Sequence, residues 1–212
     1  MKNFCDIYSV SRETFSKLEK YCQAIIEWQS KMNLVSKSSL QDIWKRHIED
    51  SAQLFNLIPP TAKNLLDIGS GAGFPGMVIA IISEEKTPYL NITLTESITK
   101  KTLFLNYTKD LLHLENTNIL NTRVETIKNK KFSIITARAV TNLVDLLEYS
   151  YQLLDKNGLC IFPKGKSYKE EIEQAKKQWQ FSLTIVDSQT SEEGKILVIN
   201  KLTKKRSAKC RE

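Results

Sequence analysis

The stretch from Leu65 to Ile81, LLDIGSGAGFPGMVIAI, decides the fold, and it holds four of the chain's seven glycines. One apolar run precedes the glycines and another follows them, which is typical of a strand, a tight loop and a helix. Glycines in such a loop allow unusual backbone angles and the close approach of a ligand. In open α/β sheets ligands lie beyond the carboxyl ends of the strands, so we expect a cofactor at this turn.

Two cofactor classes compete for this loop. The letters GAGFPG (71–76) match the dinucleotide fingerprint G-x-G-x-x-G, but an isolated match is weak. In that fingerprint the first glycine follows the strand directly; here this glycine is Gly69, and the sixth position from it is Phe74. The frame that starts at Asp67, D-x-G-x-G-x-G, is similar to the first motif of class I S-adenosylmethionine methyltransferases. Asp67 would then end a strand and accept a hydrogen bond from the cofactor's ammonium group or a nearby water, and Pro75 suits the first turn of the next helix.

A second carboxylate follows the next predicted strand. NITLTES contains Glu96 at the strand's end, where its carboxylate can accept hydrogen bonds from both ribose hydroxyls of a nucleoside. Enzymes that bind NAD use the same arrangement, so Glu96 does not separate the two cofactor classes. A solvated glutamate at a strand end is the structural alternative.

Composition bears on the class of binding partner and on the cellular compartment. The 212 residues carry a net charge of +7, which favours a polyanionic partner such as nucleic acid, although a lysine-rich surface explains it equally well. The four cysteines form no CxxC pair and there are two histidines, which argues against a zinc site or a disulfide framework. The N-terminus has no apolar signal core, and the longest purely apolar run, Met77 to Ile82, is too short to span a bilayer. We therefore expect a soluble cytoplasmic protein.

Hydrophobic periodicity divides the chain near residue 60. Apolar residues recur at three- and four-residue spacing from Phe15 to Met32, and a second helix is predicted from Leu40 to Leu57, before two prolines. From residue 64 onward, short apolar segments alternate with helical ones, which predicts a mostly parallel sheet with helices on both faces. The segments SLTIVDS and KILVINKL could form a terminal antiparallel pair. The basic tail is expected to be disordered, and it could touch phosphates.

Four motifs taken together are more specific than any one of them. RHIEDS (46–51), DIGSGAGFPG (67–76), TARA (136–139) and PKG (163–165) closely resemble the RsmG family, also called GidB. Its members are bacterial methyltransferases that act on guanine N7 in 16S ribosomal RNA. The resemblance runs from about Trp28 to Leu202. It implies a class I, Rossmann-like methyltransferase fold with a mostly parallel seven-stranded sheet. It divides the chain into a helical N-terminal extension (1–60), an S-adenosylmethionine domain (61–202) and a basic tail (203–212).

The resemblance also implies the residues of the site. The expected cofactor-binding residues are Asp67, Gly69, Gly71, Phe74, Glu96, Val124, Glu125 and Arg138. The expected substrate-binding residues are Arg46, His47, Asp50, Ser51 and Lys164. Besides Glu96, three of these assignments have structural alternatives. Phe74 could belong to the core, Arg138 could hold the methionine carboxylate, an RNA phosphate or a structural ion pair, and Arg46 could pair with Asp50 one helical turn away.

Catalytic motifs that the sequence lacks indicate which atom of the RNA is methylated. Methylation of exocyclic amines usually goes with an N/D-P-P-Y/F box, where this chain has TARA, and methylation of pyrimidine carbon-5 usually needs a Pro-Cys pair, which does not occur. Guanine N7 already presents a lone pair and needs no general base, so positioning and electrostatics suffice and we assign no catalytic acid or base. Methylation of a ribose 2′-oxygen through Lys164 and Asp67 stays open on composition alone.

Two rival functions remain at this point. The first is an NAD-dependent oxidoreductase, which rests on GAGFPG and Glu96 but lacks a plausible proton-relay residue. The second is an RNA-binding protein with an empty cofactor site, against which the intact glycine loop argues. The main expectation is a monomeric enzyme whose partner is 16S rRNA, the 30S subunit or its assembly intermediate, with no membrane partner and no bound metal.

Overall fold

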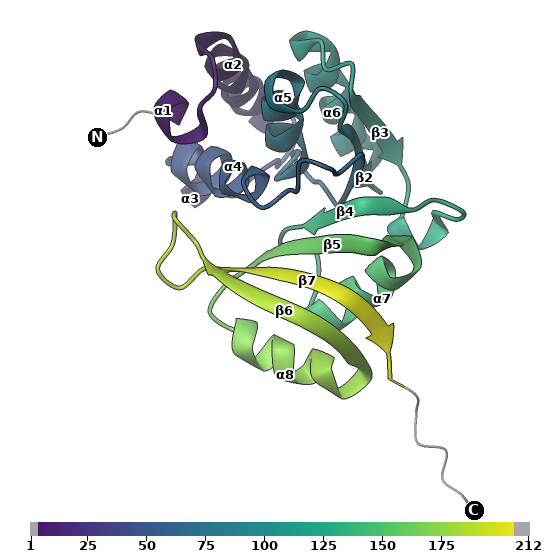
Figure 1. The fold of residues 1–212 in the computed structure, drawn as a ribbon. Coiled ribbons are helices and arrows are strands. Elements are labelled where there is room, and N and C mark those ends of the chain that lie inside the picture. Colours follow the sequence, from purple (N-terminus) through teal and green to yellow (C-terminus); the bar gives the residue numbers. More distant parts are fainter. Residues whose placement is uncertain (1–3, 206–212) are drawn as a thin grey trace, which may run out of the picture.

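The computed structural model describes residues 4–205, and its centre is a seven-stranded sheet (Figure 1). The strands are β1 (Asn64–Ile68), β2 (Asn91–Glu96), β3 (Thr117–Asn121), β4 (Phe132–Ala137), β5 (Leu154–Lys164), β6 (Trp179–Asp187) and β7 (Lys195–Lys204). Their order in the sheet is β3-β2-β1-β4-β5-β7-β6. Neighbours among β1 to β5 are parallel, whereas β7 runs antiparallel to both β5 and β6. The predicted mostly parallel sheet and the predicted terminal antiparallel pair are both confirmed.

Helices connect the parallel strands and cover the two faces of the sheet. The helices after β1 are α5 (Gly76–Lys86), α6 (Thr99–Leu112), the 3₁₀ turn η2 (Val124–Thr126), α7 (Leu143–Leu153) and α8 (Tyr168–Gln178). Figure 1 shows α5 and α6 on one side of the sheet and α7 and α8 on the other. Because β1 to β5 run parallel, their carboxyl ends meet at one edge of the sheet.

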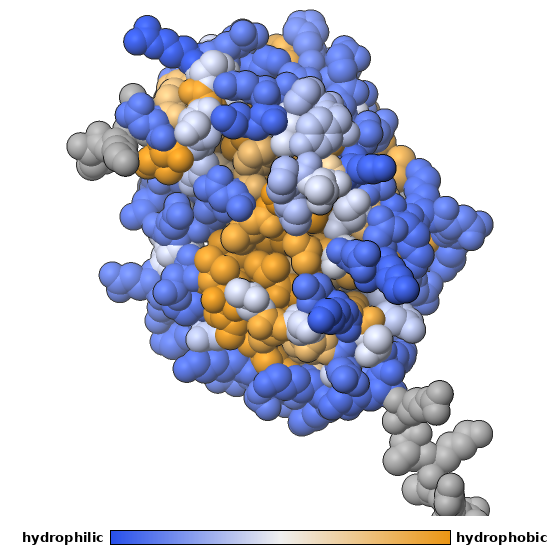
Figure 2. All heavy atoms as spheres, viewed as in Figure 1, coloured by the Kyte–Doolittle hydropathy of each residue, from blue (hydrophilic) through white to orange (hydrophobic). Residues whose placement is uncertain are grey.

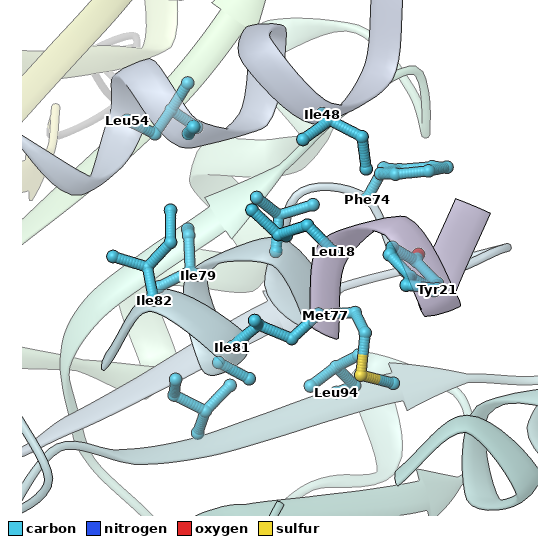
Figure 3. Packing of buried hydrophobic residues seen from close by; sticks show 14 of the residues in the cluster. Leu18, Tyr21, Ile48, Leu54, Phe74, Met77, Ile79, Ile81, Ile82 and Leu94 are labelled. Atoms are coloured by element: carbon cyan, nitrogen blue, oxygen red, sulfur yellow. The ribbon is translucent and has the colours of Figure 1, made fainter. Parts of the chain in front are cut away.

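Two hydrophobic cores form because successive strand residues point to opposite faces. Leu65 packs in the core that contains α5 and α6, whereas its neighbour Leu66 packs in the core that contains α7 and α8. Figure 3 shows the first core, where Leu18 and Tyr21 of the N-terminal region meet Met77 and other side chains of α5. The N-terminal helices therefore share a core with the sheet.

The N-terminal helices are α1 (Phe4–Tyr8), α2 (Arg12–Gln29), α3 (Lys37–Leu40), the π-helical segment η1 (Trp44–Glu49) and α4 (Asp50–Phe55). The predicted first helix is confirmed as α2, which begins where the Ser11 side chain accepts a hydrogen bond from the Thr14 N–H at 3.2 Å. The predicted continuous helix from Leu40 to Leu57 is wrong, because the π-helical segment η1 replaces its middle part.

Tertiary contacts explain the wider turns of η1. Trp44 packs edge-on against Phe4, with ring centroids 5.3 Å apart, while His47 stacks on Phe74 of the glycine loop at 4.6 Å. A π-helical segment changes the direction of side chains along a helix, and such segments are frequent at functional sites. The contacts that η1 makes lie far away in the sequence, so the local pattern did not reveal it.

An apolar patch lies on one face of the molecule. Figure 2 shows apolar side chains gathered in the middle of one face, where Figure 1 places α4 beside the strands. Half-buried residues of the first core include Phe55, Leu57, Leu159 and Val198.

No helix in the described part of the chain is long and apolar enough to cross a membrane. β7 continues to Lys204, past the predicted start of the tail, and residues 206–212 lie outside the described residues.

Candidate functional site at the carboxyl edge of the sheet

The glycine loop between β1 and α5 needs its glycines for different reasons. Gly69, Gly71 and Gly73 have φ values of 61°, 60° and 106°, which L side chains rarely adopt. A Cβ on Gly73 would lie 2.6 Å from the Tyr21 hydroxyl, and one on Gly69 would lie 2.8 Å from Val140 Cγ2. A Cβ on Gly71 would meet only the Gly69 carbonyl oxygen, at 3.9 Å. The loop is therefore packed on two sides and open above Gly71.

Asp67 lies beneath this loop and not at its surface. Its side chain is fully buried; Oδ2 accepts from the Gly76 N–H at 3.2 Å and Oδ1 accepts from the Thr136 hydroxyl at 2.8 Å. Burial raises the pKa of this carboxyl group to about 6, although its hydrogen bonds act in the opposite direction. Both of its oxygens thus fix the loop to β4 and α5, and a direct contact of Asp67 with the cofactor stays a prediction.

Glu96 reaches the loop from the end of β2. Its Oε2 accepts from the Gly71 N–H at 2.9 Å, and its Oε1 accepts from the Ile98 N–H at 2.8 Å. The side chain is thus held in one orientation, while each carboxylate oxygen keeps a second lone pair for another donor. This arrangement can bind the two hydroxyl groups of a ribose.

A cavity of about 190 Å³ collects four of the eight predicted cofactor residues. Gly69, Glu96, Val124 and Glu125 line it together. Apolar side chains form its wall beside the two carboxylates, which suits a nucleoside with an apolar base face and a polar edge. The residues present therefore fit the adenosine part of S-adenosylmethionine.

Val140 and Tyr149 are among the residues of this cavity that were not predicted. Val140 follows the TARA motif directly, and its position after the end of β4 could have identified it. Tyr149 comes from α7, where it belongs to an ordinary amphipathic pattern that carries no signal of a site. Burial and the neighbouring Glu125 carboxylate raise the pKa of the Tyr149 phenol.

Arg138 connects β4 to the RHIEDS segment. Its Nη1 donates to the Asp50 carboxylate at 2.9 Å and to the Arg46 carbonyl oxygen at 3.1 Å, and its Nη2 lies 2.6 Å from His47 Nδ1. The guanidinium carbon also lies 5.0 Å from the centre of the Phe74 ring. Asp50 therefore pairs with Arg138, and the pair between Arg46 and Asp50 expected on a regular helix does not form.

These contacts fix the protonation state of His47. A guanidinium can only donate, so Nδ1 of His47 accepts and Nε2 carries the proton. Burial, followed by the Arg138 charge, lowers the pKa of His47 to about 4, so the ring is neutral at physiological pH. Nε2 of His47 and the hydroxyl of the fully buried Ser51 have no hydrogen-bond partner among the described residues.

Phe74 occupies the interior of the site. It is buried between His47, the Arg138 guanidinium and Tyr21, whose ring centroid lies 5.3 Å away. Its ring is absent from the lining of the cavity beside Glu96. The Phe74 side chain thus occupies a core position, and its contact with the cofactor stays a prediction.

A second cavity, of about 390 Å³, lies over the ends of β4 and β5. Of the predicted residues, Asp50, Arg138 and Lys164 line it. Lys164 Nζ is not free, because it donates to Glu171 Oε2 at 2.7 Å and to the Thr141 carbonyl oxygen at 3.1 Å. The structure therefore brings these three residues to one cavity, while the Arg46 side chain is exposed and makes no ion pair in the described range 4–205.

Comparison with known proteins agrees with this geometry. Residues 14–199 match the GidB family model, described as rRNA small subunit methyltransferase G. Two curated relatives named ribosomal RNA small subunit methyltransferase G are similar over most of the chain. The protein from Cereibacter sphaeroides (strain ATCC 17025 / ATH 2.4.3) is 40% identical over 89% of this chain and 90% of its own length. The protein from Ruegeria sp. (strain TM1040) is 38% identical over 90% of this chain and 92% of its own length.

Solved structures share the fold at low sequence identity. M. jannaschii TYW2 in complex with AdoMet matches with a TM-score of 0.56 and 13% identity, over 75% of this chain and 76% of that one. The Methanococcus jannaschii fibrillarin pre-rRNA processing protein matches with a TM-score of 0.54 and 14% identity, over 72% of this chain and 75% of that one. These likenesses support the class I methyltransferase fold predicted from the sequence.

Proposed function

The chain belongs to the GidB family of small-subunit rRNA methyltransferases, and we propose that it transfers a methyl group from S-adenosylmethionine to N7 of a guanine in 16S ribosomal RNA. The observation that carries the proposal is the cavity at the carboxyl edge, where the glycine loop and the fixed carboxylate of Glu96 meet. Family membership removes the main support for the rival oxidoreductase, because GAGFPG belongs to the methyltransferase motif in this frame.

The chain's own residues divide the work of holding the cofactor. S-adenosylmethionine supplies an electrophilic methyl group when it is bound. Glu96 accepts from the ribose hydroxyls, Val124 and Val140 provide apolar surface for the adenine, and Glu125 lies at its polar edge. The open space above Gly71 receives the methionine part, and Asp67 supports the loop from below.

Arg138 is the residue we assign to the methionine carboxylate. Its side chain follows the carboxyl end of β4 and is 17% exposed, so it can contact a ligand. Asp50 and His47 hold the side chain in place through separate nitrogens. A planar guanidinium that is held in this way binds a carboxylate with fixed geometry.

Methyl transfer to N7 asks little acid-base chemistry of the protein. The N7 lone pair attacks directly, and the product base carries a positive charge. A neutral His47 adds no positive charge beside that product, and the Asp50 carboxylate lies near enough to Arg138 to offset its charge. We assign His47, Asp50 and Ser51 to the substrate side, where Asp50 lines the larger cavity and the fully buried Ser51 lies in the interior, and no residue of the set acts as a base.

The same edge of the sheet offers cations to RNA. Arg46, Lys100 and Arg123 are exposed near the two cavities and form no ion pairs with other described residues. The whole chain carries a net charge of +7, and these three cations would guide the phosphate backbone of the RNA toward the site. We propose that the protein works as a cytoplasmic monomer on 16S rRNA, the 30S subunit or its assembly intermediate. The helical residues 1–60 would pack on the methyltransferase domain and face the RNA.

A pair of assays tests the proposal. S-adenosylmethionine should raise the melting temperature of the protein, and NADH should not. Methyl-labelled S-adenosylmethionine should then label small-subunit rRNA that lacks base modifications, offered free or as particles. A higher melting temperature with NADH and not with S-adenosylmethionine would instead favour the NAD-dependent oxidoreductase. Cofactor binding with no label in any RNA would favour the RNA-binding protein with an idle cofactor site.

A further inference from the structure

The cavity over β4 and β5 borders the proposed cofactor cavity. Ala139 and Thr141 line the former, whereas Val140 between them lines the latter. Ala139 has a φ of 56°, a conformation uncommon for residues other than glycine and frequent at functional sites. One short segment therefore separates the two cavities, and a molecule in one lies directly beside a molecule in the other.

The outer wall of this cavity is a fixed loop. Residues 188–194 connect β6 to β7, and Gln53 of α4 binds them through its buried amide. The Gln189 N–H donates to Gln53 Oε1 at 2.8 Å, and Gln53 Nε2 donates to the Ser188 hydroxyl at 3.2 Å. Thr190 adds a hydrogen bond from its hydroxyl to Asp50 Oδ1 at 2.7 Å. The space is thus bordered by elements that hold each other in position.

One acceptor in this cavity has unused capacity. Glu171 Oε2 accepts from the Leu143 N–H at 2.8 Å and from Lys164 Nζ at 2.7 Å. Its Oε1 has only a long contact with the Ser167 hydroxyl, at 3.4 Å. A carboxylate can only accept hydrogen bonds. Glu171 therefore presents a fixed acceptor to whatever enters the cavity.

Building on the proposed function, we propose that this cavity binds the target guanine, unstacked from the RNA, and that Glu171 is the residue that selects it. Oε1 accepts from the N1–H and the 2-amino group of the base, which are donors in guanine. Adenine presents an acceptor at N1 and has no 2-amino group, so it is rejected. N7 lies on the other ring, so this contact leaves the attacking lone pair free. The volume, about 390 Å³, lies within the range of roughly 300–1,000 Å³ typical of ligand pockets.

A substrate series tests the role of Glu171. Small-subunit RNA carries either guanosine or inosine at the methylated position; inosine keeps N1–H and N7 but lacks the 2-amino group. We expect the wild-type kcat/KM to be roughly 10-fold lower with inosine. In Glu171→Gln, the side-chain carbonyl oxygen must accept the hydrogen bonds from Lys164 and from the Leu143 N–H, because only an oxygen can accept them. The NH₂ group of the glutamine then faces the N1–H and 2-amino donors of the base. This variant should lose roughly 10-fold or more with guanosine and show a guanosine-to-inosine ratio near one.

Controls separate selection from folding. Glu170→Gln makes the same change of charge on the neighbouring, exposed residue, and it should keep the wild-type ratio. Both variants should bind S-adenosylmethionine as the wild type does. A wild-type enzyme that ignores the 2-amino group, or a Glu171→Gln variant that keeps the wild-type ratio, would overturn the assignment. A wild type that methylates neither RNA would instead refute the proposed function.

Filling the cavity gives an independent test of where the base binds. Gly165 lines this cavity, and a Cβ built on it meets no atom within 4 Å. Gly165→Phe should therefore fold, and it should raise the KM for RNA several-fold more than Gly165→Ala while cofactor affinity stays constant. If Gly165→Phe shows wild-type KM for RNA, the target base does not enter this cavity.

Discussion

Asp67 shows how burial changes the role of a motif carboxylate. Its position suggested a direct cofactor contact, but its oxygens bind the Gly76 N–H and the Thr136 hydroxyl. Its pKa is raised from 3.8 to about 6. Between these two pH values the folded protein binds more protons than the unfolded chain, so this group stabilises the fold most in acid. Its contribution is lost as pH rises through the folded pKa.

Replacing Asp67 by Asn should remove that pH dependence. An amide can accept from the Gly76 N–H and donate to Thr136, so the packing is retained. We expect the melting temperature of Asp67→Asn, relative to wild type, to improve as pH rises from about 4 to about 6. Asp67→Ala is the contrast, because it leaves the Gly76 N–H without a partner at a cost of about 1–3 kcal/mol. An advantage of Asp67→Asn that shrinks over this pH range would contradict the account.

Arg138 and Lys164 are both cations of the larger cavity, but we assign them to different ligands. Arg138→Ala should weaken S-adenosylmethionine binding roughly 10-fold or more, since a hydrogen bond to a charged group contributes about 1.5–3 kcal/mol. Lys164→Ala should spare cofactor affinity and reduce the use of RNA, because it releases Glu171. Calorimetry with the cofactor and steady-state kinetics with RNA separate the two. Unchanged cofactor affinity in Arg138→Ala would refute its assignment, and lost affinity in Lys164→Ala would move that residue to the cofactor side.

Among the elements, the glycine loop offers a matched pair of substitutions. Gly71 and Gly73 both have positive φ, but only Gly73 is surrounded, by Tyr21 and Met77. Gly71→Ala should cost about 1 kcal/mol of stability, the usual cost of a left-handed residue other than glycine. Gly73→Ala adds a steric clash and should cost several times as much, while also displacing the loop from the cofactor cavity. Denaturant unfolding measures both, and equal costs would contradict this description of the loop.

The elements also show how far local sequence patterns reach. Periods of two and of three to four residues predicted the strands and α2, because burial on one face follows directly from those periods. The π-helical segment escaped prediction, since Trp44 and His47 take their positions from partners distant in sequence. Tyr149 and Glu171 escaped for the same reason: each comes from an amphipathic helix and becomes part of a cavity only through packing. The motifs predicted which loops meet at the carboxyl edge of the sheet, and tertiary contacts decided which side chains line the two cavities.

Across the whole molecule, both cavities and several exposed cations that form no ion pair within residues 4–205 lie at the carboxyl edge of the parallel strands. RNA affinity should therefore fall steeply with salt, as expected when phosphate contacts release counterions. Arg46→Ala at this edge should reduce the slope of log affinity against log salt by roughly 0.7–0.9. Lys63→Ala, just before the amino end of β1, is the matched control and should leave the slope unchanged. Equal effects of the two substitutions would mean that the RNA does not bind preferentially at the carboxyl edge.

The position of the new methyl group tests the central claim most directly. Small-subunit rRNA that lacks base modifications is incubated with the protein and S-adenosylmethionine, then reduced with borohydride and cleaved with aniline, which is selective for N7-methylated guanosine. We expect a single break that depends on both the enzyme and the cofactor, and that names the guanine. Methyl label in the RNA without such a break would contradict N7 as the target atom, while the fold and the cofactor assignment would stand.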